Sequence, residues 1–158
     1  MTGRHAGASV AVRRDARVAD DPPWQVVDRA TKTNDFPSWS GHPSGRARYE
    51  TALRVEVCVP NRHAEKCVWI DAHVLDAEGW VIHRETLALR WTQAAGDGGD
   101  RFVYDGPLYH GSVATPGSVS PRPDARVVEY RVYCEQGGEI TTDGRTHYCF
   151  LRSDVGSG

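Results

Sequence analysis

Two histidines and two carboxylates occur close together in the sequence, in a pattern that could bind a metal ion. They are Asp71, His73, His83 and Glu85, on either side of a turn that ends at Gly79. If Gly79 forms a bulge, the two histidines face each other and so do the two carboxylates. Opposed carboxylates are unfavourable unless a cation or an arginine intervenes, and two histidines with a carboxylate are common ligands of first-row metals. This register predicts a small metal-dependent enzyme.

A second register removes that site. If all four residues 76–79 form the loop, Leu75 faces Trp80 and Asp71 faces Arg84, which is an ordinary cross-strand ion pair. A shift of one residue moves every side chain to the other face of a strand, so the pattern alone leaves the register open. We therefore favour a solvated polar face without a cofactor, and keep the metal-dependent enzyme as the alternative.

Four cysteines form the other group with specific chemistry. Cys58 and Cys67 bracket the turn-forming stretch PNRHAEK, and Cys134 and Cys149 bracket a longer stretch with two glycine turns. Opposite residues of an antiparallel pair lie at a distance that suits a disulfide. The second pair meets only if both glycine turns lie within one wide loop. A four-thiolate zinc site normally uses closely spaced C-x2-4-C pairs, which are absent, so we predict two disulfides, with free buried thiols as the alternative.

Aromatic residues in loops provide candidate binding positions. Phe36 and Trp39 lie in a stretch rich in Pro, Ser and Gly, and Tyr109 and His110 precede the irregular segment 111–123. Such side chains either cap the core or form a contact surface with a large rigid area. No catalytic triad is indicated, because the GHPSG sequence does not have the G-x-S-x-G order and lacks a preceding strand and following helix. These four residues are the predicted ligand contacts.

The elements that must position these residues are strands. From residue 48 to 59 the sequence alternates, and one face carries Tyr49, Thr51, Leu53, Val55, Val57 and Val59. Further strands are predicted at 24–27, 67–75, 80–91, 101–104 with 108–110, 125–135 and 146–152. Six or seven short strands without an amphipathic helix predict an all-β fold. We expect a single antiparallel β-sandwich, immunoglobulin-like in general form, with a small barrel as the alternative.

Length and composition limit the domain count and the cellular setting. The 158 residues predict a flexible N-terminal arm at 1–22, one sandwich domain at 23–153 and a flexible tail at 154–158. The net charge of −2 argues against a main role in nucleic-acid binding, although it allows a local basic patch. There is no apolar run of about 18 residues and no signal-like segment, so we expect no membrane contact and a cytoplasmic location, or an extracellular one if the cysteines are paired.

The stretch VVEYRVYCEQGGEITTDGRTHYCFL resembles the final hairpin of immunoglobulin-like starch-binding modules. Asp143, Gly144 and Tyr148 carry the resemblance, which implies a sandwich and a carbohydrate ligand. The turn tryptophan and asparagines that contact sugar in that family have no counterpart here. Taken together, the sequence predicts a non-enzymatic β-sandwich module for binding or assembly, which contacts a protein partner or a carbohydrate through its loop ends. It leaves the oligomeric state open.

Overall fold

The computed structural model describes residues 16–19, 23–34, 46–60, 65–94, 98–114 and 124–153. All regular structure in these ranges is β-strand, and no helix within them could cross a membrane. The all-β prediction is therefore confirmed. The strands are β1 (Arg17–Val18), β2 (Gln25–Asn34), β3 (Arg46–Val59), β4 (Cys67–Leu75), β5 (Val81–Ala94), β6 (Asp100–Ala114), β7 (Val127–Gln136), β8 (Glu139–Thr142) and β9 (His147–Ser153).

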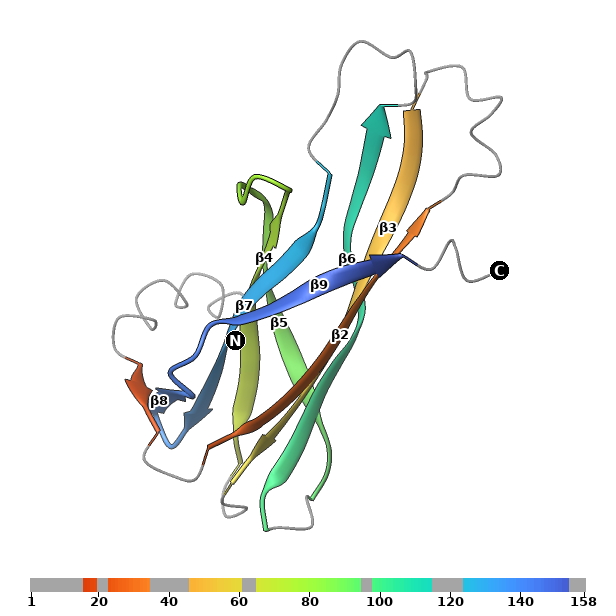
Figure 1. The fold of residues 1–158 in the computed structure, drawn as a ribbon. Coiled ribbons are helices and arrows are strands. Elements are labelled where there is room, and N and C mark those ends of the chain that lie inside the picture. Colours follow the sequence, from red (N-terminus) through yellow and green to blue (C-terminus); the bar gives the residue numbers. More distant parts are fainter. Residues whose placement is uncertain are drawn as a thin grey trace.

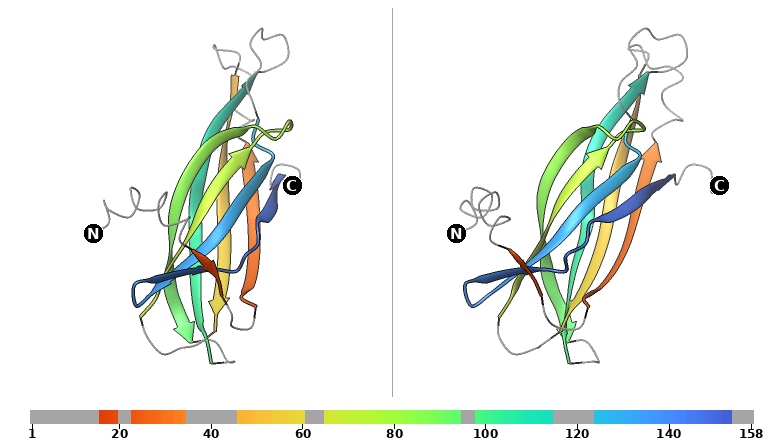
Figure 2. Two further views of the ribbon diagram at one scale, coloured as in Figure 1. Left: turned by 90° about the vertical axis from the view of Figure 1, so that its left-hand side faces the viewer. Right: turned by 60° about the vertical axis from the view of Figure 1, so that its left-hand side comes forward.

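Seven strands close into a barrel in the order β7-β4-β5-β6-β3-β2-β9. Closure depends on β9, which lies between β7 and β2 in Figures 1 and 2. Its first half pairs antiparallel with β7, where Cys149 lies opposite Val128, and its second half pairs parallel with β2, where Leu151 lies opposite Ala30. The short strands β8 and β1 extend from the far end of β7, outside the ring. β1 lies within the segment predicted as an arm.

The predicted immunoglobulin-like sandwich is wrong. A sandwich keeps two separate sheets with free edges. Here β9 pairs with both β2 and β7, so the seven-stranded ring has no free edge. Alternation along a strand predicts which side chains share a face. It does not predict which strand lies beside it, so a sandwich and a barrel produce the same sequence pattern.

The core lies inside the barrel and follows the predicted alternation. The apolar face predicted along residues 48–59 is buried at every position. It meets inward residues of the other strands, which include Val68, Ile70, Ala72, Val74, Val128 and Val132. Polar side chains such as Arg54 and Glu56 point outward from β3 and pair with each other at 3.3 Å. The interior is therefore a filled core of side chains, as in other small barrels.

The predicted first disulfide is wrong because β3 and β4 are not neighbours. Cys58 lies between Gln25 and Arg101, whereas Cys67 lies opposite Glu135. The intervening segment connects two strands that have different partners in the ring, instead of turning back as a hairpin. All four cysteines are free thiols.

The predicted second disulfide is wrong for a different reason. The tight turn falls at Gly137 and Gly138, both with positive φ, and forms the β7–β8 hairpin. The chain then passes Asp143 and returns beside the other half of β7, so that Cys149 lies opposite Val128. Cys134 is six positions further along β7, roughly 20 Å away at about 3.3 Å per residue.

Candidate functional site

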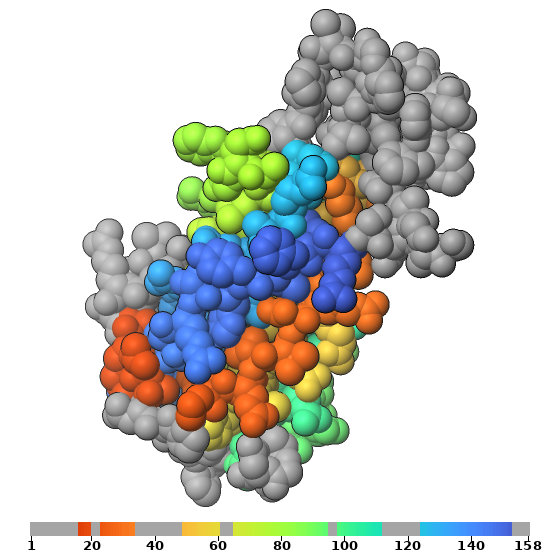
Figure 3. Space-filling view, in the orientation of Figure 1, coloured from red at the N-terminus to blue at the C-terminus, as the bar shows by residue number. Residues whose placement is uncertain are grey.

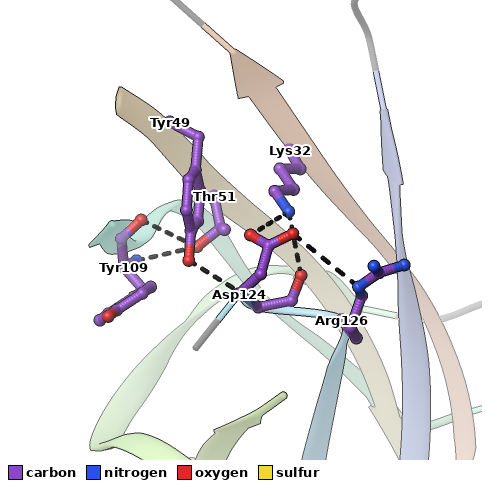
Figure 4. Close-up of polar contacts among 7 residues, drawn as sticks. Lys32, Tyr49, Thr51, Tyr109, Asp124 and Arg126 are labelled. Atoms are coloured by element: carbon purple, nitrogen blue, oxygen red, sulfur yellow. Dashed lines mark hydrogen bonds and ion pairs between the residues drawn. The ribbon is translucent and has the colours of Figure 1, made fainter. Parts of the chain in front are cut away.

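A polar network joins β2, β3 and the segment that leads into β7. We call its members Lys32, Tyr49, Asp124 and Ala125 the Lys32 network (Figure 4). Lys32 Nζ donates to Asp124 Oδ1 at 2.5 Å and to the Ala125 carbonyl oxygen at 3.2 Å. The same ammonium lies 4.4 Å from the centre of the Tyr49 ring, which adds a cation–π contact. A mostly buried cation is thus held by a carboxylate, a carbonyl and an aromatic face.

The Tyr49 hydroxyl completes the network. It accepts a hydrogen bond from the Ala125 amide at 3.0 Å, and the ring is only 1% exposed. Burial raises the pKa of Tyr49 to about 12, and the nearby Asp124 carboxylate also favours the protonated form. The phenol is therefore neutral at physiological pH and serves here as a hydrogen-bonding group.

The backbone next to the network ties two further strands to it. The Arg126 amide donates to the Leu75 carbonyl at 2.8 Å, and the Leu151 amide donates to the Arg126 carbonyl at 3.0 Å. Arg126 Nε also lies 3.8 Å from Asp124 Oδ2. Residues 124–126 are consequently fixed to strands β2, β3, β4 and β9. The arrangement fastens one end of the barrel, and its ionisable groups are engaged with one another.

Two of the four predicted ligand contacts lie near this network. At a bulge between β3 and β6, Thr51 Oγ1 donates to the Tyr109 carbonyl at 3.1 Å and accepts from the Tyr109 amide at 2.9 Å. The Tyr109 ring lies 6.1 Å from the Tyr49 ring and 5.2 Å from His83, so it is partly buried packing. His110 is exposed, with Nδ1 3.6 Å from Glu50. The predicted contacts Phe36 and Trp39 lie outside the described residues.

The predicted metal ligands are not brought together on one site. The turn begins in the bulged register, with Leu75 opposite Val81, but a second irregularity then places His83 opposite Val74. Neither predicted register is therefore right beyond the turn. His73 faces Arg84 in the shifted pairing, and Glu85 lies opposite Ala72.

His83 and Glu85 contact each other, whereas His73 and Asp71 have partners outside the predicted set. His73 Nδ1 lies 3.3 Å from Glu129, His83 Nε2 lies 3.0 Å from Glu85, and Thr86 donates to Asp71 at 2.8 Å. In the ranges that the structure covers, no three His, Cys, Asp or Glu side chains gather as metal ligands would.

A second buried cluster, which the sequence analysis missed, lies where β9 meets β2 and β7. Tyr130 donates to Asp28 Oδ2 at 2.5 Å, and its ring stacks on His147 at 5.0 Å. His147 Nε2 lies 2.7 Å from Asp143 Oδ2. Burial raises the pKa of Cys149 to about 12, and Asp28 adds to the effect, so this thiol is protonated and unsuited to nucleophilic attack. Three separated strands supply the cluster, which is why no local motif signals it.

The outer surface of the closing strand carries exposed apolar side chains. We call Val27, Tyr148 and Phe150 the β9 face; their exposed fractions are 65%, 57% and 71%. Figure 3 shows the dark blue side chains of β9 at the surface between β7 and β2. Phe150 lies opposite the partly exposed Val127 of β7, which extends the apolar surface. A strand was predicted at residues 146–152, but the sequence did not show the side on which its aromatic rings lie.

Comparisons with known proteins leave the family open. No protein-family model matches the chain, and no curated protein matches it. Among solved structures, the chain is similar to a protein from Bordetella pertussis provisionally named ApaA. The two share 13% identity at a TM-score of 0.39, over 84% of this chain and 96% of that one.

Proposed function

We propose that this protein is a non-enzymatic binding module that contacts a protein partner through the β9 face. The supporting observation is the exposure of Val27, Tyr148 and Phe150 on two adjacent strands. Aromatic residues are enriched at the centres of protein interfaces, where they provide a large contact area with few rotatable bonds. Single exposed apolar residues are common on any surface, whereas a contiguous group is typical of an interaction site.

The side chains around the aromatic rings favour a protein over a carbohydrate. Val27 and Phe150 offer no hydrogen-bonding group, and a sugar needs several placed polar groups to fix its orientation. Glu129, opposite Tyr148, already accepts a hydrogen bond from it and lies beside His73. The implied partner therefore buries the two rings against apolar side chains of its own.

A paired comparison of surface variants tests this function. The test variant is Tyr148→Ser with Phe150→Ser, and the control is Trp80→Ser, because Trp80 is 72% exposed in the β4–β5 turn, away from the β9 face. Each protein is cross-linked in extract of its source cells, and the captured proteins are identified by mass spectrometry. We expect the wild type and the control to capture the same partner and the double variant to lose it.

Two results would contradict the proposal. Capture that survives in the double variant removes the β9 face from the binding surface. Binding to a glycan array that the double variant abolishes, without any protein captured, assigns the same rings to a carbohydrate.

A further inference from the structure

Two exposed arginines lie at one end of the β9 face. Arg152 follows Phe150 at the next outward position of β9 and lies opposite Thr31, and Arg29 is the neighbouring outward residue of β2. Both arginines are exposed, and neither forms an ion pair within the described ranges. Arg29 also lies directly opposite Arg54, a second arginine, whose charge is already compensated by its ion pair with Glu56 at 3.3 Å.

The acidic residues near this end are already engaged. Asp124 is shared by Lys32 and Arg126, and Asp105 lies 3.5 Å from Arg54. The surface beside Phe150 is therefore locally positive, although the whole chain carries a net charge of −2. A charge excess at one place, against the overall sign, is a means of selecting and orienting a partner.

The other end of the face carries charges of both signs, because Glu129 lies opposite Tyr148 and the positive charge of Arg131 also acts on Tyr148. Tyr148 lies opposite Glu129 and donates a hydrogen bond to it, and this bond raises the pKa of the Tyr148 phenol. Successive outward positions of a strand are about 7 Å apart, so Arg152 and Tyr148 are separated by roughly two such steps. The excess of positive charge is thus at the Arg152 end of the face.

We propose that the β9 face binds an extended acidic peptide segment of the partner, with carboxylates at Arg29 and Arg152 and an apolar side chain on Phe150. This inference rests on the proposed function and specifies its partner. Arginine suits the role because its planar group can hold a carboxylate through two parallel hydrogen bonds. A nucleic-acid strand fits less well, since its evenly spaced phosphates would meet Glu129 at the Tyr148 end.

Labelled peptides provide a direct test on the whole chain. The probe is a fluorescein-labelled peptide of about ten residues that repeats Leu-Ser-Asp-Ser, so that Leu and Asp alternate on one side of the extended chain, which is long enough to span β9. Its matched controls replace every Asp by Asn or by Lys, and a single-stranded oligothymidylate of similar length tests for nucleic acid. Binding is followed by fluorescence anisotropy at low and at high salt.

The protein variants separate the charges from the rest of the surface. Arg29→Gln with Arg152→Gln is the test, and Arg84→Gln with Arg90→Gln is the control, because these two exposed arginines lie on β5. We expect the Asp peptide to bind the wild type and the control equally. Binding should weaken by about 10-fold in the test variant, in the Asn peptide, or at high salt, as expected for loss of two exposed ion pairs.

The outcomes distinguish this inference from the proposed function. If the Asp peptide fails to bind, or binds both double variants equally, while Tyr148→Ser with Phe150→Ser still abolishes partner capture, the acidic-peptide inference is wrong and the binding function stands. Oligothymidylate binding that depends on Arg29 and Arg152, without peptide binding, replaces the peptide by a nucleic acid. A change from dimer to monomer in Tyr148→Ser with Phe150→Ser identifies a second copy of this chain as the occupant.

Discussion

The Lys32 network and the β9 face each contain a tyrosine on a strand of the same barrel, yet the two have opposite roles. Tyr49 is 1% exposed and its hydroxyl accepts a hydrogen bond from the backbone, whereas Tyr148 is 57% exposed on the outer wall. The pKa of each phenol is raised, that of Tyr49 mainly by burial and that of Tyr148 mainly by its hydrogen bond to Glu129. The side of the barrel wall, and not the residue type, decides whether such a ring stabilises the fold or remains available for contact.

The largest expected difference is in stability after truncation of the two rings. Tyr49→Ala should lower the free energy of unfolding by about 3 to 5 kcal/mol, because it opens a cavity and leaves the Ala125 amide without its acceptor. Tyr148→Ala should change it by less than about 0.5 kcal/mol, as for most exposed positions. Urea denaturation of both variants measures the contrast. Similar losses in the two variants would show that the β9 face supports the fold.

Alkaline pH should destabilise the folded protein through the buried Tyr49 phenol. The pKa of Tyr49 is about 12 in the folded protein and 10.0 in the reference state, so below pH 10 its phenol is protonated in both states. Above pH 10 the unfolded chain releases the proton and the folded chain retains it, so stability falls as the pH rises toward 12. Two pKa units correspond to a loss of about 2 to 3 kcal/mol. Unfolding measured from pH 9 to 12 should show a shallower decline in Tyr49→Phe, and equal slopes would contradict this assignment.

Loss of a cation should have a smaller effect that again separates the two regions. Lys32→Met leaves the partly buried Asp124 without its closest cation and should reduce stability by about 1 to 3 kcal/mol. Arg29→Met, on the outer wall beside the β9 face, should change stability by less than about 0.5 kcal/mol. Adding Asp124→Leu to Lys32→Met should recover part of the loss, because it removes the uncompensated carboxylate. A double variant as unstable as the sum of its single variants would show that the pair does not act as a unit.

The smallest expected effect concerns the cysteines, which again differ in burial: Cys67 is exposed, whereas Cys134 and Cys149 are buried. Because all four thiols are free, a reducing agent should leave the melting temperature unchanged. In the native protein the exposed Cys67 should react first with iodoacetamide, since burial raises the pKa of Cys134 and of Cys149 to about 12. Mass spectrometry after timed alkylation gives the order. A reduction-dependent melting temperature would indicate a bridge in solution.

The sequence predicted the faces of strands better than their neighbours. The alternation from Tyr49 to Val59 placed the buried side of β3 correctly, and the Asp76–Gly79 turn was placed correctly too. The sequence was a poorer guide to which strands pair with each other, because the partner of a strand depends on side chains far away in the sequence. The joining of β7 and β2 by β9 has no local signal, so the barrel was not distinguished from a sandwich.

The candidate sites show the same limit at single residues. In β9 the side chains of Tyr148, Cys149, Phe150 and Leu151 are all largely apolar, so periodicity could not show which pair faces inward. The structure places Cys149 inside and the two aromatic rings outside. The prediction that His73 faces His83 required one particular register. A second irregularity in the β4–β5 pair changed that register. The Lys32 network combines residues from three distant segments, which no motif connects.

The position of β9 also sets the order in which the chain can fold during synthesis. Ala30 emerges from the ribosome long before its partner Leu151, so β2 and β7 retain unpaired edges until the residues of β9 are available. Unpaired edges can pair with other chains, and contacts between distant segments form slowly. The nascent protein therefore passes through an open sheet that is prone to aggregation, and translation of β9 ends that exposure.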